Sequence, residues 1–143
     1  ILSERFLKWA VKRHYKALGY KVRVSRIRLG NTEIDGEVVG EGWKIALEIK
    51  SPGDDLTRGL GQLAEAVAFG YTQAAIVTTL RKARQVDPTV FDRLGLILLG
   101  VNSSGKVHIV LPREEAADMP EPSPSAKEAL KAILEKLTTS QDR

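Results

Sequence analysis

Cysteine is absent from the 143 residues of the chain. This absence excludes disulfides, thiolate metal sites, iron–sulfur clusters and cysteine nucleophiles. Histidine is nearly absent as well, because His14 and His108 lie far apart and do not have the spacing of histidine metal sites. Chemistry that needs thiols or paired histidines is therefore excluded.

Long hydrophobic runs are also missing. The longest, such as LGLILLG, are far too short to span a bilayer, and no signal peptide is visible. The GLG at 59–61 lacks the lysine of a P-loop, so neither a membrane nor a nucleotide cofactor is expected. We expect a cytoplasmic protein whose natural start lies upstream of Ile1. The scarcity of Asn, Gln, Met and Cys fits a thermophile.

Charge is unevenly distributed along the chain. Residues 1–30 contain nine Lys/Arg and one acid, whereas the remainder contains thirteen Lys/Arg and seventeen acids. This asymmetry indicates a basic surface beside an acidic one, and basic surfaces attract polyanions, most commonly nucleic acid. From charge alone, a solvated helix with lysines on its wet side explains the pattern equally well.

Hydrophobic periodicity predicts an α/β domain with a mixed sheet flanked by helices. The expected elements are, in order, a helix at 2–18, a strand at 20–29 with a bulge near Ser25, strands at 32–39 and 43–50, a helix at 57–69, a strand at 74–79, a short helix at 87–95, and strands at 96–101 and 106–111.

Three regions are expected along the chain. The α/β domain covers 1–112, and a polar linker containing proline covers 113–125. An amphipathic C-terminal helix at 126–143 carries an apolar stripe of Leu130, Ile133, Leu134 and Leu137. That helical tail either folds back on the domain, contacts another copy or begins a further region.

A two-residue turn at Glu41-Gly42 predicts a register in which partner residue numbers sum to 83. Gly36 then faces Leu47 and Val38 faces Ile45. The same register places Ile34 opposite Ile49, Glu33 opposite Lys50 and Asp35 opposite Glu48. One face of the hairpin is apolar, and the other carries the charged residues.

Two carboxylates, Asp35 and Glu48, are thus expected directly across a ladder. Like charges about 5 Å apart repel each other unless a cation lies between them. Mg²⁺ or Mn²⁺ suits this position, because hard ions prefer carboxylate oxygen and keep several waters. Lys50 projects from the same face as Glu48 and is placed to position or help activate a water.

The alternative is a ladder of ion pairs. Arg26 or Arg28 on the preceding strand would neutralise Asp35 or Glu33, and Lys50 would pair with Glu33. Surface pairs of this kind are common and contribute little stability.

An acid on one strand, Glu48-Ile49-Lys50 on the next and a following helix with Gln62 together resemble the PD-(D/E)XK nuclease superfamily. This superfamily includes restriction endonucleases and archaeal Holliday-junction resolvases. The resemblance covers roughly residues 2–80. It implies a restriction-endonuclease-like fold and a Mg²⁺- or Mn²⁺-dependent endonuclease that hydrolyses DNA. Many relatives are homodimers, because cutting two strands takes two sites.

The resemblance also implies roles for individual residues. Asp35 and Glu48 would bind the metal, and the carbonyl of Ile49 would complete its shell. Lys50 would assist the nucleophilic water, and Gln62 would orient Lys50 or a water. For Gln62 the alternative is an exposed helix face.

Some features depart from the superfamily pattern or leave alternatives open. Ile34 stands at the position of the name-giving proline, which is a frequent change. The glycine-serine signature associated with junction resolvases is absent before Asp35, which weakens the case for four-way junctions. Glu4 is the acid of the first helix and is either a further metal ligand or a favourable charge in the first helical turn.

DNA binding is assigned to basic residues near the motif. Arg23, Arg26, Arg28 and the basic first helix would hold the phosphate backbone, with salt-sensitive contacts that are largely blind to sequence. Arg58 either touches a phosphate or lies on an exposed helix face. Arg81, Lys82 and Arg84 either extend this track or lie in a solvated loop.

Two rival functions remain at this stage. One is a catalytically silent protein of nuclease fold that binds DNA or a protein partner. The other is a scaffold role in a larger complex, suggested by the linker and the amphipathic tail.

Overall fold

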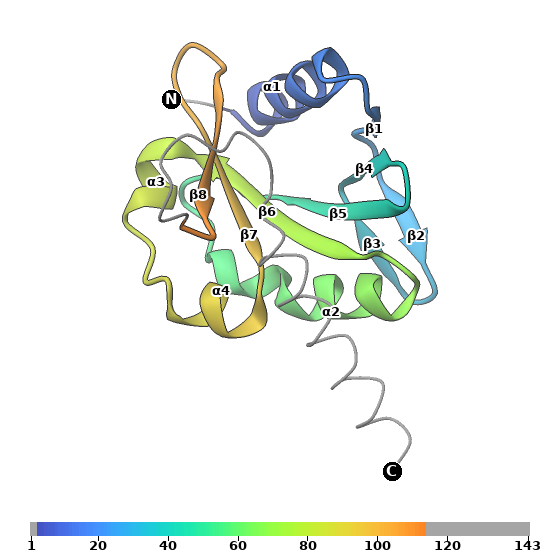
Figure 1. Cartoon of the computed structure of the whole chain (residues 1–143). Helices are drawn as coiled ribbons and strands as arrows, with labels where there is room; N and C mark the ends of the chain where they lie inside the picture. Colours follow the sequence, from blue (N-terminus) through green and yellow to red (C-terminus); the bar gives the residue numbers. More distant parts are fainter. Residues whose placement is uncertain (1–2, 114–143) are drawn as a thin grey trace.

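The computed structural model describes residues 3–113, and within this range a mixed sheet of six strands forms the centre (Figure 1). The strand order is β1-β4-β5-β6-β7-β8, in which β5, β6 and β7 are parallel and the other neighbours are antiparallel. The strands are β1 (Lys21–Arg23), β4 (Gly36–Gly40), β5 (Trp43–Ile49), β6 (Gln73–Thr79), β7 (Ile97–Val101) and β8 (Val107–Leu111). The predicted mixed sheet is confirmed.

Helices cover both faces of this sheet, as Figure 1 shows for α1 and α2. Helix α1 (Glu4–Ala17) packs Leu7, Ala10 and Val11 onto one face. The other face is covered by the 3-10 helix η1 (Leu56–Gly59), α2 (Leu60–Ala68), α3 (Leu80–Arg84), α4 (Thr89–Leu94) and the hairpin of β2 (Ile27–Leu29) and β3 (Thr32–Ile34). Two apolar cores therefore lie on opposite sides of the sheet.

The predicted strand at 32–39 is interrupted at Asp35. Its first half is β3, which pairs with β2 in a separate two-stranded sheet, and its second half is β4. The register of β4 with β5 is the predicted one, with Gly36 opposite Leu47 and Val38 opposite Ile45. The chain changes partner at Asp35 because β2 pairs with the residues before it.

Two predicted pairs are wrong for this reason. Ile34 pairs with Ile27 and packs into the core under α2, instead of facing Ile49. Glu33 lies opposite Arg28, and not opposite Lys50. The single strand predicted at 20–29 is likewise two strands, β1 and β2, in different sheets.

Helix α3 was not among the predicted elements. Thr79 caps it, because its Oγ1 accepts a hydrogen bond from the N–H of Lys82 at 3.2 Å. The residues predicted as a possible solvated loop, Arg81 to Arg84, therefore belong to a helix that packs against β7 and β8.

The predicted linker beyond Arg113 and the helix at 126–143 lie outside the described residues. None of the helices between residues 3 and 113 combines the length and apolar character that a membrane crossing requires.

Candidate active site

Glu48 is a buried acid near the end of β5. Its neighbours Leu47 and Ile49 point into the core under α1, so alternation directs Glu48 to the opposite face, with Ala46. Only 5% of the residue is exposed, and its Oε2 is buried with no hydrogen-bond partner among the described residues. Such a group requires an explanation, because unpaired buried polar atoms are rare and costly.

Asp35 lies against the backbone of β5 beside Glu48. Its N–H donates to the carbonyl of Leu47 at 3.0 Å, and its Oδ2 accepts from the N–H of Ile49 at 2.8 Å. The carboxyl groups of Asp35 and Glu48 lie close enough to act on each other. The expected proximity of the two acids is found, although Asp35 lies between β3 and β4 and is not itself a ladder partner of Glu48.

The surroundings of Glu48 favour its protonated form. Burial, followed by the hydrogen bond and negative charge of Asp35, raises the pKa of Glu48 to about 9. The ammonium of Lys50 lowers this pKa, and the charge of Glu4 raises it. Without a cation, Glu48 therefore favours its protonated form at neutral pH.

Lys50 and Glu48 meet beneath Gly59, the last residue of η1. A Cβ at Gly59 would lie 2.9 Å from Cγ of Glu48 and 3.2 Å from Cε of Lys50. The N–H of Lys50 donates to the carbonyl of Val77 at 2.8 Å, which continues the pairing of β5 with β6. The two side chains therefore lie next to each other, and a residue without a side chain covers them.

Thr78 is a further polar residue on this face of the sheet. On β6, Ile76 pairs with Glu48, and Thr78 comes two residues later. Because side chains alternate between the two faces of a strand, Thr78 lies on the same face as Glu48, beside Lys50. Its hydroxyl is fully buried and has no hydrogen-bond partner within the described part of the chain. Sequence reasoning missed both Thr78 and Gly59, because a buried strand threonine and a helix-end glycine follow no chemical pattern.

The residues fit a hard divalent ion better than a zinc ion. No group of three or more His, Cys, Asp or Glu residues between positions 3 and 113 is arranged to hold a metal. A structural zinc site needs four protein ligands, whereas Mg²⁺ is usually held by one or two carboxylates, waters and substrate phosphates. The unpartnered Oε2 of Glu48, next to Asp35, meets this simpler requirement.

Glu4 lies near this pair but has another partner. Its residue is exposed, and its Oε1 pairs with Nζ of Lys8 at 3.3 Å. Its charge reaches Glu48, as the raised pKa of Glu48 reflects. The role of Glu4 as a metal ligand stays a prediction, as do the roles of Ile49 and the two acids.

The ion-pair ladder does not form. Across residues 3–113, the pair of Lys8 and Glu4 is the one side-chain ion pair, so no arginine neutralises Asp35 or Glu33. Nε of Arg23 bonds to Oγ of Ser25 at 3.0 Å, and Nε of Arg28 bonds to the carbonyl of Gly30 at 3.3 Å.

The other predicted binding residues lie at different places around the motif. Arg58 is exposed and directly precedes Gly59, and Gln62 is half-buried one turn further along. Residues three apart share a helix face, so Gln62 lies on the same side as Gly59. Arg23 and Arg28 are exposed on β1 and β2, and Arg26 is exposed between these strands.

Comparison with known proteins places the fold but not a family. No family model matches the chain, and no curated protein matches it. The likeness is to solved structures, and at 16% identity or less it concerns the fold alone.

One similar structure is the SPO1766 protein of unknown function from Silicibacter pomeroyi, with a TM-score of 0.55 and 15% identity over 94% of this chain and 85% of that one. Another is a fdxN element excision controlling factor protein from Anabaena variabilis, with a TM-score of 0.54 and 16% identity over 74% of this chain and 98% of that one. A third is a XisH family protein from Nostoc punctiforme, with a TM-score of 0.50 and 15% identity over 72% of this chain and 96% of that one.

Proposed function

We propose that the protein is a divalent-metal-dependent nuclease that hydrolyses phosphodiester bonds of DNA. The observation that carries this proposal is the unpartnered, buried oxygen of Glu48 beside Asp35, with the side chain of Lys50 next to Glu48. The three residues lie at the carboxyl end of β5, and open α/β sheets usually bind ligands beyond the carboxyl ends of their strands.

A purely structural role explains this pair poorly. Burying the carboxyl group of Glu48 beside that of the half-buried Asp35 costs stability, and strongly perturbed acids such as Glu48 gather at functional sites. Neither acid forms an ion pair with a basic side chain within residues 3–113. A bound cation would remove the electrostatic repulsion between the two carboxylates, and both would serve as its ligands.

Asp35 and Glu48 would hold Mg²⁺ or Mn²⁺, with the carbonyl of Ile49 as a further ligand. When bound, such an ion polarises the phosphodiester and lowers the pKa of its water. Lys50 would donate hydrogen bonds to the attacking hydroxide or to the oxygens that gain charge in the transition state. Gln62 lies on the same side of α2 as Gly59. It would orient Lys50 or a water.

The fold neighbours are consistent with this proposal. One is described as a factor controlling excision of the fdxN element, which agrees with a nucleic-acid substrate. Their low identity leaves open the rival function, a silent nuclease-fold protein that binds DNA or a protein partner. If the protein cuts both strands of a duplex, a homodimer would supply the two sites.

A cleavage assay distinguishes the proposed nuclease from the rival binding protein. Labelled single strands, duplexes, flaps and four-way junctions are incubated with Mg²⁺ or Mn²⁺ and the wild-type protein, Glu48→Gln, Lys50→Ala or the control Glu65→Gln. Glu65 is exposed on α2, so its variant should cleave like the wild type. We expect Glu48→Gln and Lys50→Ala to lose about 100-fold or more in rate. Binding without cleavage, unchanged in Glu48→Gln, supports the rival.

A further inference from the structure

A groove of about 710 Å³ lies beside the candidate active site, where the parallel strands end. It begins at Pro52, two residues beyond Lys50, and continues along α3 to the turn after β7. The described residues that line it are Pro52, Thr79, Leu80, Arg81, Arg84, Gln85, Val101, Asn102 and Ser103.

Helix α3 is held in place along this groove. Gly100 of β7 allows the close approach, because a Cβ there would lie 2.8 Å from Cα of Leu80. Ala83 is buried beneath the helix, and the Thr79 cap fixes its first turn. Arg81 and Arg84, by contrast, are exposed and line the groove. The packing of α3 against β7 therefore fixes the positions of the two arginines, which do not lie in a free loop.

The groove is positively charged. Its described lining contains two arginines and no acid. The two acids of the neighbouring loop are engaged locally, since Asp54 accepts from the N–H of Ser51 at 3.0 Å and Asp55 caps η1. A polyanion that enters the groove would therefore meet cations and hardly any opposing charge.

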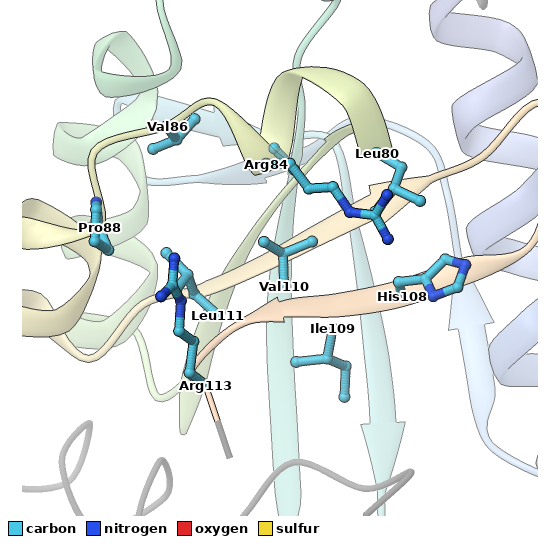
Figure 2. A pocket seen from close by; sticks show the side chains of 10 residues that line it. Leu80, Arg84, Val86, Pro88, His108, Ile109, Val110, Leu111 and Arg113 are labelled. Carbon is cyan, nitrogen blue, oxygen red and sulfur yellow. The ribbon is translucent and has the colours of Figure 1, made fainter. Parts of the chain in front are cut away.

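A second, smaller pocket of about 280 Å³ continues from the same helix (Figure 2). Leu80 and Arg84 line both pockets. Figure 2 shows Arg84, His108 and Arg113 around the smaller one, with the apolar side chains of Val110 and Leu111 between them. The two pockets thus lie on either side of Leu80 and Arg84, and arginines line both of them.

We infer that this groove binds an unpaired nucleic-acid strand. Arg81 and Arg84 would contact phosphates, and the apolar surfaces of Pro52 and Leu80 would contact bases. Unstacked bases can use such apolar surfaces and nearby amides, whereas a duplex keeps its bases stacked and presents mainly its phosphates. The inference rests on the proposed function, because the strand would lead to Asp35 and Glu48.

Equilibrium binding tests the groove without cleavage. Fluorescence anisotropy of a labelled oligothymidylate is measured in EDTA with the full chain, with Arg81→Ala/Arg84→Ala, and with the control Lys21→Ala/Arg93→Ala, which removes the same charge outside the groove. All four side chains are exposed, so melting temperatures should stay unchanged. We expect the groove variant to lose about tenfold in affinity and its salt slope to fall by ~1.4, as for two lost phosphate contacts to a single strand. The control should bind like the wild type.

Three results would overturn the inference: no binding of the oligothymidylate by the wild type, loss of binding in the control but not in the groove variant, or equal affinity for a duplex of mixed sequence. The outcome is separable from the proposed function. Groove-dependent binding by a protein that never cleaves rejects the nuclease alone. Cleavage that depends on Glu48 but not on Arg81 and Arg84 rejects the groove alone.

Discussion

At the scale of single residues, the site depends on one absent side chain. Gly59 allows Glu48 and Lys50 to lie side by side beneath it, because a Cβ there would lie 2.9 Å from Cγ of Glu48 and 3.2 Å from Cε of Lys50. Its φ of −85° is open to any residue, so the glycine is needed for space and not for backbone conformation.

Gly59→Ala should therefore lower the cleavage rate about tenfold or more, by displacing the two charged side chains. Gly61→Ala is the matched control, because Gly61 lies in α2 and nothing lies within 4 Å of its added Cβ. That control should keep its rate and gain about 0.5–1 kcal/mol of stability. Cleavage rates and thermal melts measure both effects, and a fully active Gly59→Ala would contradict this account of the pocket.

The pKa of Glu48 predicts how stability depends on pH without metal. Because this pKa is raised to about 9 in the folded protein, the folded state binds the proton more tightly than the unfolded chain. The resulting stabilisation is complete below the ordinary pKa of a glutamic acid and is lost as pH rises through 9. Glu48→Gln removes this dependence.

Urea denaturation in EDTA between pH 5 and 9 measures this effect. The free energy of unfolding of Glu48→Gln, relative to wild type, should rise with pH by at most about 1.4 kcal/mol per pH unit. A difference that stays constant over the range would show that Glu48 is ionised throughout.

At the scale of elements, the sequence was informative where local rules decide the outcome. The turn at Glu41-Gly42 and strict alternation fix the β4–β5 register, which brings Asp35 to Glu48. The interruption at Asp35 could not be predicted, because it depends on β2 as a distant pairing partner. Helix α3, from Leu80 to Arg84, is too short for periodicity to show.

Helix α1 supports the sheet through its buried face. Leu7→Ala should destabilise the protein by about 2–5 kcal/mol. Leu7 is fully buried, so the substitution leaves a cavity that the neighbouring sheet cannot fill. Leu18→Ala is the control at the end of the same helix, since Leu18 is 55% exposed, and it should cost less than about 1 kcal/mol. Denaturant midpoints that fall equally in both variants would mean that α1 is not docked as described.

At the scale of the whole molecule, the acid pair and the basic groove lie at the same edge of the sheet. The charge count pointed to residues 1–30 as the basic surface, whereas the groove beside the site is lined by arginines of α3. Only the parallel order of β5, β6 and β7 brings these distant segments together.

A divalent ion should stabilise the whole protein, and more so at high pH. Metal competes with the proton on Glu48, so Mg²⁺ should raise the melting temperature more at pH 8 than at pH 6. Glu48→Gln should show little of this increase. Differential scanning fluorimetry measures it, and an equal increase in wild type and variant would place the ion elsewhere.

The most direct measurement is anomalous scattering from a crystal soaked in Mn²⁺. The account predicts one strong peak within about 2.3 Å of carboxylate oxygens of both Asp35 and Glu48, absent in a soaked Glu48→Gln crystal. A crystal soaked at pH 8 that shows no peak between the two carboxyl groups would contradict it.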